Sequence, residues 1–348
     1  MKWICASVIS CLIHLQNKLK KFTQKRSMRT LKIITAVFLT LVLAKSTAQK
    51  VNLDTLLTNC YRTTYNYQSI HNDSLQLDWY KHNDFKNDSL QPVLILMHGG
   101  SFMYGSKQSD YCLKFANDWT QKGFQVVSIQ YRLTLLGKSF HCDLPKQKKI
   151  ETFQEATYDL WKGTNKVIEL SSINNIDTSK IIIAGVSAGA EAVLNAAFMP
   201  MEQYQFKNIL PKNFNYAGVI SYAGAVADTN WITNKTAIPA LLFHGSCDVY
   251  VPHRTAPHHY CKQNTPGALM LSGSVDIANR LKNLNMPYYL YLECESGHSV
   301  CKTPIWNQFE DTYNFVNKVI IKQSFGQSFQ LNTNIPGKCK FVEEVYCN

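Results

Sequence analysis

A serine flanked by glycines stands between two segments of contrasting pattern. Gly185-Val186-Ser187-Ala188-Gly189 follows a short β-branched run at 180–184 and precedes a series of good helix formers at 190–198. The run predicts a buried parallel strand and the series predicts a helix, which makes the pentapeptide the turn between them. Such a turn is too sharp for side chains at its flanks. It would place the Ser187 hydroxyl above the sheet, beside the positive end of the helix.

Apolar runs and helical patterns alternate along the chain. Strands are expected at 92–97, 125–131, 180–184, 217–222, 238–243 and 288–292. Helices are expected at 110–122, 152–170, 190–198, 274–283 and 306–322. Residues 49–90 are mostly polar, with stretches in which apolar and polar residues alternate, and this pattern is typical of strands at a sheet edge. The alternation predicts an α/β fold with a mostly parallel central sheet, helices on both faces, and active groups at the carboxyl ends of the strands.

The positive charge is concentrated at the N-terminus. Residues 1–48 hold nine Lys and Arg and no Asp or Glu, whereas the remaining chain carries 27 basic and 24 acidic residues. The net charge of +12 therefore indicates an addressing signal and not a nucleic-acid surface. A basic segment, an apolar run of twelve residues at 33–44 and Ser46-Thr47-Ala48 predict a signal peptide cleaved after Ala48, with Met28 as an alternative start. An uncleaved signal anchor is the alternative, although twelve residues are few for a membrane span.

Cysteine usage fits an oxidising compartment. Removal of the leader leaves nine of the eleven cysteines, so disulfides are expected, with at least one thiol free or paired between chains. Cys294–Cys301 and Cys339–Cys347 are the first candidates because they are close in sequence. No cysteine and histidine cluster has zinc-ligand spacing, so a structural metal is not expected.

Two glycines directly follow the strand expected at 92–97. In His98-Gly99-Gly100 the glycines let backbone N–H groups turn inward, which suits an oxyanion hole. We assign its donors to Gly99 or Gly100 together with Ala188, the residue after the serine.

Two later strands also end in groups that can activate a serine. Asp248 follows the strand at 238–243, and His298 follows the strand at 288–292. A carboxylate that orients an imidazole, which then takes the serine proton, makes the serine a nucleophile. The order Ser187, Asp248, His298 is that of α/β-hydrolases and not that of chymotrypsin or subtilisin.

Other polar residues near these segments are expected to be structural. His98 and His244 each precede a glycine turn, and Tyr131-Arg132-Leu133 closes a strand. Asp159, on the following helix, is also interpreted as structural. Glu293 and Glu295 are rivals of Asp248, but both lie too near His298 in sequence to approach its far nitrogen easily.

Together these motifs resemble those of α/β-hydrolases of the secreted carboxylesterase or acetyl-esterase type. The resemblance spans residues 93–298 and rests on His98-Gly99-Gly100 with Phe102 and Gly105, Tyr131-Arg132-Leu133, Gly185 to Gly189, His244-Gly245-Ser246-x-Asp248 with Val251-Pro252, and Gly297-His298. It implies an α/β-hydrolase fold with Ser187 as nucleophile, Asp248 and His298 as its partners, and Gly99, Gly100 and Ala188 as the oxyanion hole. Val186, where many members carry an acid, and Ala190, often glycine, depart from the pattern.

The predicted reaction is hydrolysis of small or glycan-borne esters through an acyl-enzyme, with no cofactor or metal. Acetylated sugars, feruloylated glycans and short-chain esters all remain open. A serine peptidase of the prolyl-oligopeptidase type is one alternative, although the mature N-terminus has no room for its usual β-propeller. A catalytically inactive hydrolase fold that serves as a binding module is the other.

The domain boundaries follow from these assignments. We expect a leader at 1–48, a catalytic domain at 49–323 and a C-terminal tail at 324–348. The protein is expected to be exported to the periplasm or the extracellular space, with no stable membrane span once the leader is removed. The segment 253–285 either walls the pocket as a lid or forms a surface excursion plus a helix. Phe102, Tyr104 and Phe140 are candidates to line the pocket, with aromatic core as the alternative.

Overall fold

The computed structural model describes residues 56–70, 73–84, 89–207, 209–333, 339 and 347. The leader predicted at 1–48 lies outside the described residues, as does most of the segment after residue 333. None of the helices in the described ranges is both long and apolar enough to cross a membrane.

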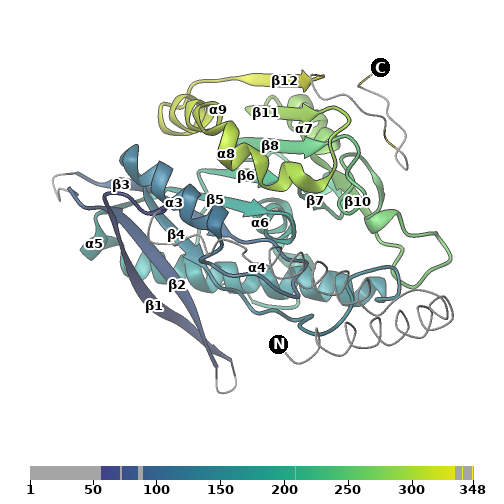
Figure 1. Cartoon of the computed structure of the whole chain (residues 1–348), viewed down its shortest axis with the longest axis horizontal. Helices are drawn as coiled ribbons and strands as arrows, with labels where there is room; N and C mark the ends of the chain where they lie inside the picture. Colours follow the sequence, from purple (N-terminus) through teal and green to yellow (C-terminus); the bar gives the residue numbers. More distant parts are fainter. Residues whose placement is uncertain are drawn as a thin grey trace, which may run out of the picture. The chain divides into compact units, whose positions relative to one another are not determined.

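A nine-stranded sheet forms the centre of the described chain (Figure 1). The strands lie in the order β1-β2-β4-β3-β5-β6-β8-β11-β12. The hairpin β1–β2 and the pair β2–β4 are antiparallel, whereas every neighbouring pair from β4 to β12 is parallel. The mostly parallel sheet confirms the predicted fold class. The strand bounds are β1 (Cys60–Ile70), β2 (Asp73–His82), β3 (Gln91–Met97), β4 (Gln125–Ile129), β5 (Ile176–Val186), β6 (Gly218–Tyr222), β8 (Ala240–Gly245), β11 (Tyr288–Glu293) and β12 (Gln327–Asn332).

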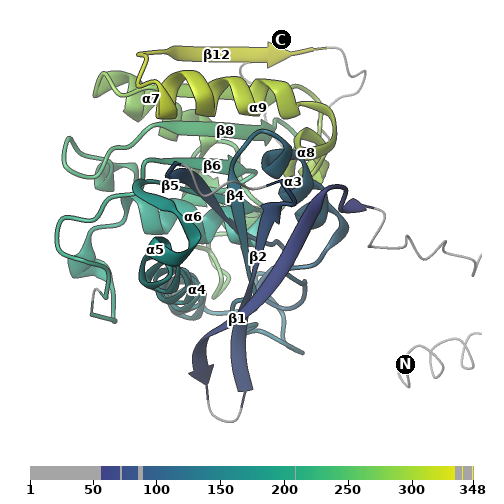
Figure 2. The same ribbon diagram turned by 90° about the vertical axis from the view of Figure 1, so that its left-hand side faces the viewer.

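Helices cover both faces of this sheet (Figure 2). One face packs against α4 (Lys146–Glu169), α6 (Ala188–Phe198) and α7 (Ser274–Asn283), and the other against α3 (Asp110–Gln121) and α9 (Phe309–Phe315). The central strands are therefore buried on both sides, which explains why β3 and β5 contain continuous apolar runs and not alternating ones. The carboxyl ends of the parallel strands meet along one edge of the sheet.

The C-terminal part differs from the sequence prediction in two elements. The single helix expected at 306–322 is divided into α8 (Thr303–Asn307), α9 and a π-helical segment, η6 (Val316–Ile321). Gln308 interrupts it with φ −128° and ψ 34°, and its side-chain amide donates a hydrogen bond to Glu293 Oε1 at 2.6 Å. The tail expected from residue 324 contains β12, which pairs in parallel with β11 and adds an edge strand to the sheet.

The disulfides join segments that are distant in sequence. Cys142 pairs with Cys261, Cys247 with Cys339, and Cys294 with Cys347, whereas Cys60, Cys112 and Cys301 are free. The predicted pairs Cys294–Cys301 and Cys339–Cys347 are therefore wrong. The physical reason is that the two tail cysteines each reach a loop that follows a central strand, β8 or β11, so that the tail is tied to the sheet instead of to itself.

Candidate active site

Ser187 occupies a strained turn between β5 and α6. Its φ of +52° and ψ of −118° are unusual for a residue with a side chain and cost about 1–3 kcal/mol. Close packing explains the flanking glycines. A Cβ on Gly185 would lie 2.2 Å from the carbonyl oxygen of Gly189, and a Cβ on Gly189 would lie 2.3 Å from that of Met97. The backbone segments can approach this closely only because neither glycine has a side chain. The turn presents the Ser187 hydroxyl at the carboxyl edge of the sheet.

Ser187, His298 and Asp248 form one hydrogen-bonded line. Ser187 Oγ lies 2.8 Å from Nε2 of His298, and Nδ1 of His298 lies 2.6 Å from Oδ2 of Asp248. Asp248 comes from the loop after β8 and His298 from the turn after β11, and these two strands are neighbours in the sheet. The structure thus brings together the three side chains that the sequence pattern singles out, with each imidazole nitrogen facing one partner.

Asp248 is fully buried and its carboxylate has several donors. Its Oδ1 accepts the N–H groups of Tyr250 at 2.9 Å and Val251 at 3.0 Å. Burial alone would raise the pKa of Asp248, but the hydrogen bond and charge of His298 outweigh it and lower the pKa below its ordinary value. Burial would lower the pKa of His298, whereas its hydrogen bonds with Asp248 and Cys301 raise it. The pair therefore favours an ionised carboxylate beside an imidazole that readily accepts a proton.

The loop after β3 lies beside Ser187 and carries the predicted oxyanion donors. The N–H of Gly99 donates to the hydroxyl oxygen of Tyr111 at 3.0 Å, so this amide already has an acceptor. Gly100 has φ +122°, and a Cβ there would lie 2.0 Å from the carbonyl oxygen of Tyr104. Ala188 is the first residue of α6, where an N–H has no intrahelical acceptor. Gly100 and Ala188 both line the cavity at Ser187.

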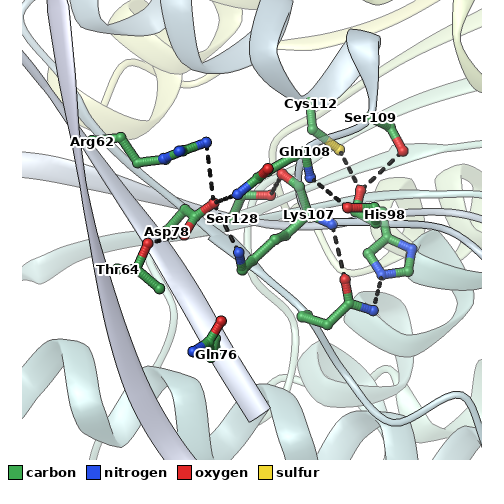
Figure 3. Close-up of polar contacts among 12 residues, drawn as sticks. Arg62, Thr64, Gln76, Asp78, His98, Lys107, Gln108, Ser109, Cys112 and Ser128 are labelled. Atoms are coloured by element: carbon green, nitrogen blue, oxygen red, sulfur yellow. Dashed lines mark hydrogen bonds and ion pairs between the residues drawn. The ribbon is translucent and has the colours of Figure 1, made fainter. Parts of the chain in front are cut away.

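A polar network connects this loop to the edge hairpin, as Figure 3 shows. Asp78 on β2 is fully buried and lies 2.9 Å from the ammonium of Lys107. The backbone N–H of Lys107 donates to Gln130 Oε1 at 3.1 Å, and the Gln130 side-chain nitrogen lies 3.1 Å from Nε2 of His98. Nδ1 of His98 hydrogen-bonds the carbonyl of Gly99 at 2.7 Å. The position of the glycine loop thus depends on contacts that begin on the edge hairpin.

The residues expected to be structural have structural contacts. The Tyr131 hydroxyl donates to the carbonyl of His98 at 2.9 Å, and the two rings stack. Arg132 forms a bidentate pair with the buried carboxylate of Asp159, at 2.8 and 2.6 Å. His244 hydrogen-bonds Ser274 Oγ and the carbonyl of Val251, and its Nε2 stays 3.6 Å from Asp248 Oδ2. These contacts fix the loops on which the triad stands.

A cavity of about 330 Å³ opens at Ser187. Of the three aromatic candidates, Tyr104 and Phe140 line it, whereas Phe102 is fully buried in the core. The segment 253–285 walls this cavity through His258 and His259, and it contains the expected helix α7. In the described part of the chain, no group of three or more His, Cys, Asp or Glu side chains could hold a metal ion.

Glu191 is a cavity residue that the sequence analysis missed. It lies on α6 one turn after Ser187, where its N–H donates to the Ser187 carbonyl at 2.9 Å. Only 1% of Glu191 is exposed, and burial raises its pKa to about 8 against the opposing influence of His298 and Lys149. The available signal was a carboxyl residue in an otherwise apolar helix directly after the serine turn.

Comparisons with known proteins identify the family and the fold. A family model described as BD-FAE matches residues 77–278. The pyrethroid hydrolase Ces2a of Mus musculus is 26% identical over 174 residues, which are 48% of this chain and 28% of that protein, so the chain matches little more than a quarter of its relative's length. Esterase 2 of Thermogutta terrifontis superposes with a TM-score of 0.54 at 13% identity in its propionate-bound form, over 76% of this chain and 95% of that one.

The native form of the same esterase superposes with a TM-score of 0.53 at 14% identity, over 76% of this chain and 93% of that one. At this level of identity a structural match speaks for the fold alone. It confirms the predicted α/β-hydrolase architecture, in which the carboxyl ends of β3, β5, β8 and β11 carry the residues described above.

Proposed function

The chain belongs to the BD-FAE family, and we propose that it is a serine carboxylesterase that forms an acyl-enzyme on Ser187. The observation that carries the proposal is the continuous line from Ser187 Oγ through His298 to Asp248, with distances of 2.8 and 2.6 Å. A relative called a pyrethroid hydrolase and structural neighbours called esterases support an ester as the bond that is cleaved.

In the first half of the reaction, His298 takes the proton of Ser187 as the hydroxyl oxygen attacks the ester carbonyl. Asp248 stabilises the imidazolium that forms. The N–H groups of Gly100 and Ala188 donate hydrogen bonds to the oxyanion, and loss of one such donor typically costs about 2.7–4 kcal/mol of transition-state stabilisation. Collapse breaks the carbon–oxygen bond to the alcohol, which leaves with the proton that His298 returns.

In the second half, water attacks the acyl-enzyme. His298 removes a proton from the water, and the same two N–H groups hold the new oxyanion. Collapse restores the Ser187 hydroxyl with the proton from His298 and releases the carboxylic acid. Atoms and protons balance with water as the only co-substrate.

The cavity favours small acyl groups on small or glycan-borne alcohols. Its volume of about 330 Å³ is at the lower end of the range for ligand pockets. Tyr104 and Tyr250 both line the cavity while 62% and 49% of their surface stays exposed. These rings offer apolar surface at the mouth for the group to which the ester is attached, such as a sugar of a polysaccharide.

We also propose that the protein is exported by its N-terminal leader to the periplasm or the extracellular space. The basic segment followed by the apolar run 33–44 supports a signal peptide, and three disulfides are compatible with an oxidising compartment.

Turnover of p-nitrophenyl acetate, butyrate and octanoate by the wild type and Ser187→Ala tests the catalytic proposal. We expect hydrolysis to fall with chain length and to disappear in Ser187→Ala together with labelling by a fluorophosphonate probe, which reacts only with an activated serine. Ser179→Ala is the matched control, because Ser179 is exposed at the opposite end of β5. Unchanged turnover in Ser187→Ala contradicts the mechanism, and cleavage of peptide amides without ester turnover favours a peptidase.

A further inference from the structure

We infer that Glu191 and His258 form a specificity subsite beside the nucleophile for a neutral, hydroxyl-bearing part of the ester. The inference deepens the proposed function and rests on it, since the ester bound at Ser187 supplies the hydroxyl. It assigns a binding role to two residues outside the Ser187–His298–Asp248 line.

Both residues line the cavity that opens at Ser187, although they come from different parts of the fold. Glu191 is on α6, and His258 belongs to the turn between the short strands β9 (Ala256–Pro257) and β10 (Met270–Gly273). Each is 1% exposed, and Oε1 of Glu191 lies 3.2 Å from Nε2 of His258. His259, the next residue, also borders the cavity. A group bound at Ser187 therefore meets these side chains within the same cavity.

The subsite contains buried polar atoms that have no hydrogen-bond partner in the described chain. They are Oε1 of Glu191, whose contact with His258 lacks hydrogen-bond geometry, and the Nδ1 atoms of His258 and His259. A folded protein rarely leaves such atoms unpaired, because each one has lost its water without a replacement. Three in one cavity wall, next to a nucleophile, indicate that a ligand supplies the missing partners.

Burial favours the neutral forms of both side chains in this polar subsite. Burial raises the pKa of Glu191 to about 8 and lowers the pKa of His258 well below its ordinary value. The charged and titratable groups that act on the pair are Lys149, Asp248, His298 and His141. A protonated carboxyl group donates one hydrogen bond and accepts others, and a neutral imidazole does the same. A hydroxyl group, which also donates and accepts, is their complement, whereas a substrate carboxylate or ammonium would lose its water without gaining an oppositely charged partner from Glu191 or His258.

The wall that carries His258 is held in place before any substrate binds. The disulfide Cys142–Cys261 fastens the turn, and the buried ammonium of Lys149 donates to the carbonyl of Gly267 at 2.9 Å. The ring of Phe140 packs edge-on against His258 with centroids 4.9 Å apart. Because the wall is already ordered, little conformational entropy is lost there when a ligand binds. Single hydrogen bonds can therefore select between substrates.

Two matched pairs of esters measure the selection. In the acyl arm, p-nitrophenyl 3-hydroxybutyrate is compared with p-nitrophenyl butyrate. In the alcohol arm, glyceryl monoacetate is compared with propyl acetate. In one of the two arms, we expect the kcat/KM of the wild type to be about five- to tenfold higher for the hydroxylated ester. This is the effect expected of one or two net hydrogen bonds. The arm that shows the preference identifies which half of the ester occupies the subsite.

Two variants of Glu191 separate hydrogen bonding from shape. Glu191→Gln keeps a neutral donor and acceptor of the same size, so the preference should persist. Glu191→Leu removes both, so the preference should vanish. Glu310→Gln is the control, because the Glu310 side chain is 69% exposed and pairs with Lys122 on the surface. If Glu191→Leu does not fold, His258→Phe replaces it, since a phenyl ring suits the contact with Phe140, and it too should lose the preference.

Absence of a preference in both arms of the wild type overturns the inference, as does a full preference in Glu191→Leu or His258→Phe. These outcomes are distinct from a failure of the proposed function. Turnover that survives Ser187→Ala overturns the esterase mechanism at Ser187. The ratios between paired substrates, in the wild type and in the Glu191 variants, still decide whether the subsite selects a hydroxyl group. Absence of turnover of all four esters overturns both.

Discussion

The backbone N–H of Gly99, in the glycine loop that borders Ser187, donates a hydrogen bond to the hydroxyl oxygen of Tyr111 at 3.0 Å. Tyr111 is buried on α3, so the contact fixes the loop to the helix layer on one face of the sheet. It divides the two successive glycines by role. The Gly99 amide has an acceptor within the protein, which leaves the neighbouring Gly100 amide as the donor of the proposed oxyanion hole.

Removal of this hydroxyl should weaken catalysis more than binding. Tyr111→Phe leaves the Gly99 N–H without its acceptor and releases the loop that carries the Gly100 donor. We expect kcat for p-nitrophenyl butyrate to fall about 5- to 150-fold, in line with the ~1–3 kcal/mol cost of an unpaired buried amide, while KM changes little. Steady-state kinetics test this. A purely structural role would lower the free energy of unfolding while leaving kcat of the folded fraction unchanged. Tyr313→Phe, at a ring on the same face without a contact to the loop, is the control.

The pH dependence of kcat/KM should follow the ionisation of His298. Catalysis requires the neutral imidazole, so the rate falls as the pH drops through the pKa of His298. Asp248 and Cys301 raise that pKa above its ordinary value of 6.5 against the opposing effect of burial, so the acidic limb should lie above that value. Asp248→Asn removes the charge that stabilises the imidazolium. It should move the limb to lower pH and reduce kcat by about 10⁴-fold.

A pH–rate profile of kcat/KM for p-nitrophenyl acetate in both proteins is the measurement. A limb at the same pH in Asp248→Asn would show that the carboxylate does not control His298. Asp276→Asn supplies the comparison. That carboxylate accepts hydrogen bonds from the N–H and the hydroxyl of Thr255 and has no contact with the imidazole.

The framework of the site was predictable because buried apolar runs determine where the parallel strands end. The runs in β5, β8 and β11 place Ser187, Asp248 and His298 at one edge of the sheet, whatever the details of the loops. The family resemblance named the roles, while the strand pattern explained the meeting of the three side chains.

Features that depend on contacts between distant segments were not predictable. Nothing near Tyr111 in the sequence indicates that its hydroxyl meets Gly99, and β12 is a polar strand whose pairing comes from the exposed edge of β11. The disulfides likewise depend on where loops after β8 and β11 approach the tail. Glu191 was the exception, since a carboxyl residue within a mainly apolar helix is visible in the sequence. Only its burial, which the structure supplies, was missing for its interpretation.

The disulfide Cys142–Cys261 should stabilise both the fold and the cavity wall. It links segments separated by 119 residues, so its removal by Cys142→Ser with Cys261→Ser should lower the free energy of unfolding by about 2–4 kcal/mol. KM should also rise, because His258 and His259 lie only three and two residues before Cys261. Urea unfolding and steady-state kinetics measure the two effects. Cys60→Ser, which removes a free thiol on β1, is the control and should change neither. A double variant as stable as the wild type would show that the disulfide does not restrain the chain.

The raised pKa of Glu191 makes stability depend on pH in a defined direction. In the unfolded chain the carboxyl titrates near its ordinary value of 4.5, whereas burial moves the pKa to about 8 in the folded protein. Between these values the folded state holds a proton that the unfolded chain releases. The contribution of Glu191 is therefore fully present below about pH 4.5 and is lost as the pH rises toward 8, with a slope of at most about 1.4 kcal/mol per pH unit.

Glu191→Gln carries no such proton, so its free energy of unfolding should gain on that of the wild type as the pH rises from about 5 to 8. Urea unfolding of both proteins at several pH values and constant ionic strength gives the difference, in which the other titrating groups largely cancel. Glu310→Gln, at an exposed carboxylate, should run parallel to the wild type throughout. Parallel curves for Glu191→Gln would mean that Glu191 is ionised in the folded protein. The neutral subsite would then have to be replaced by a charged one, in which the Glu191 carboxylate pairs with a protonated His258.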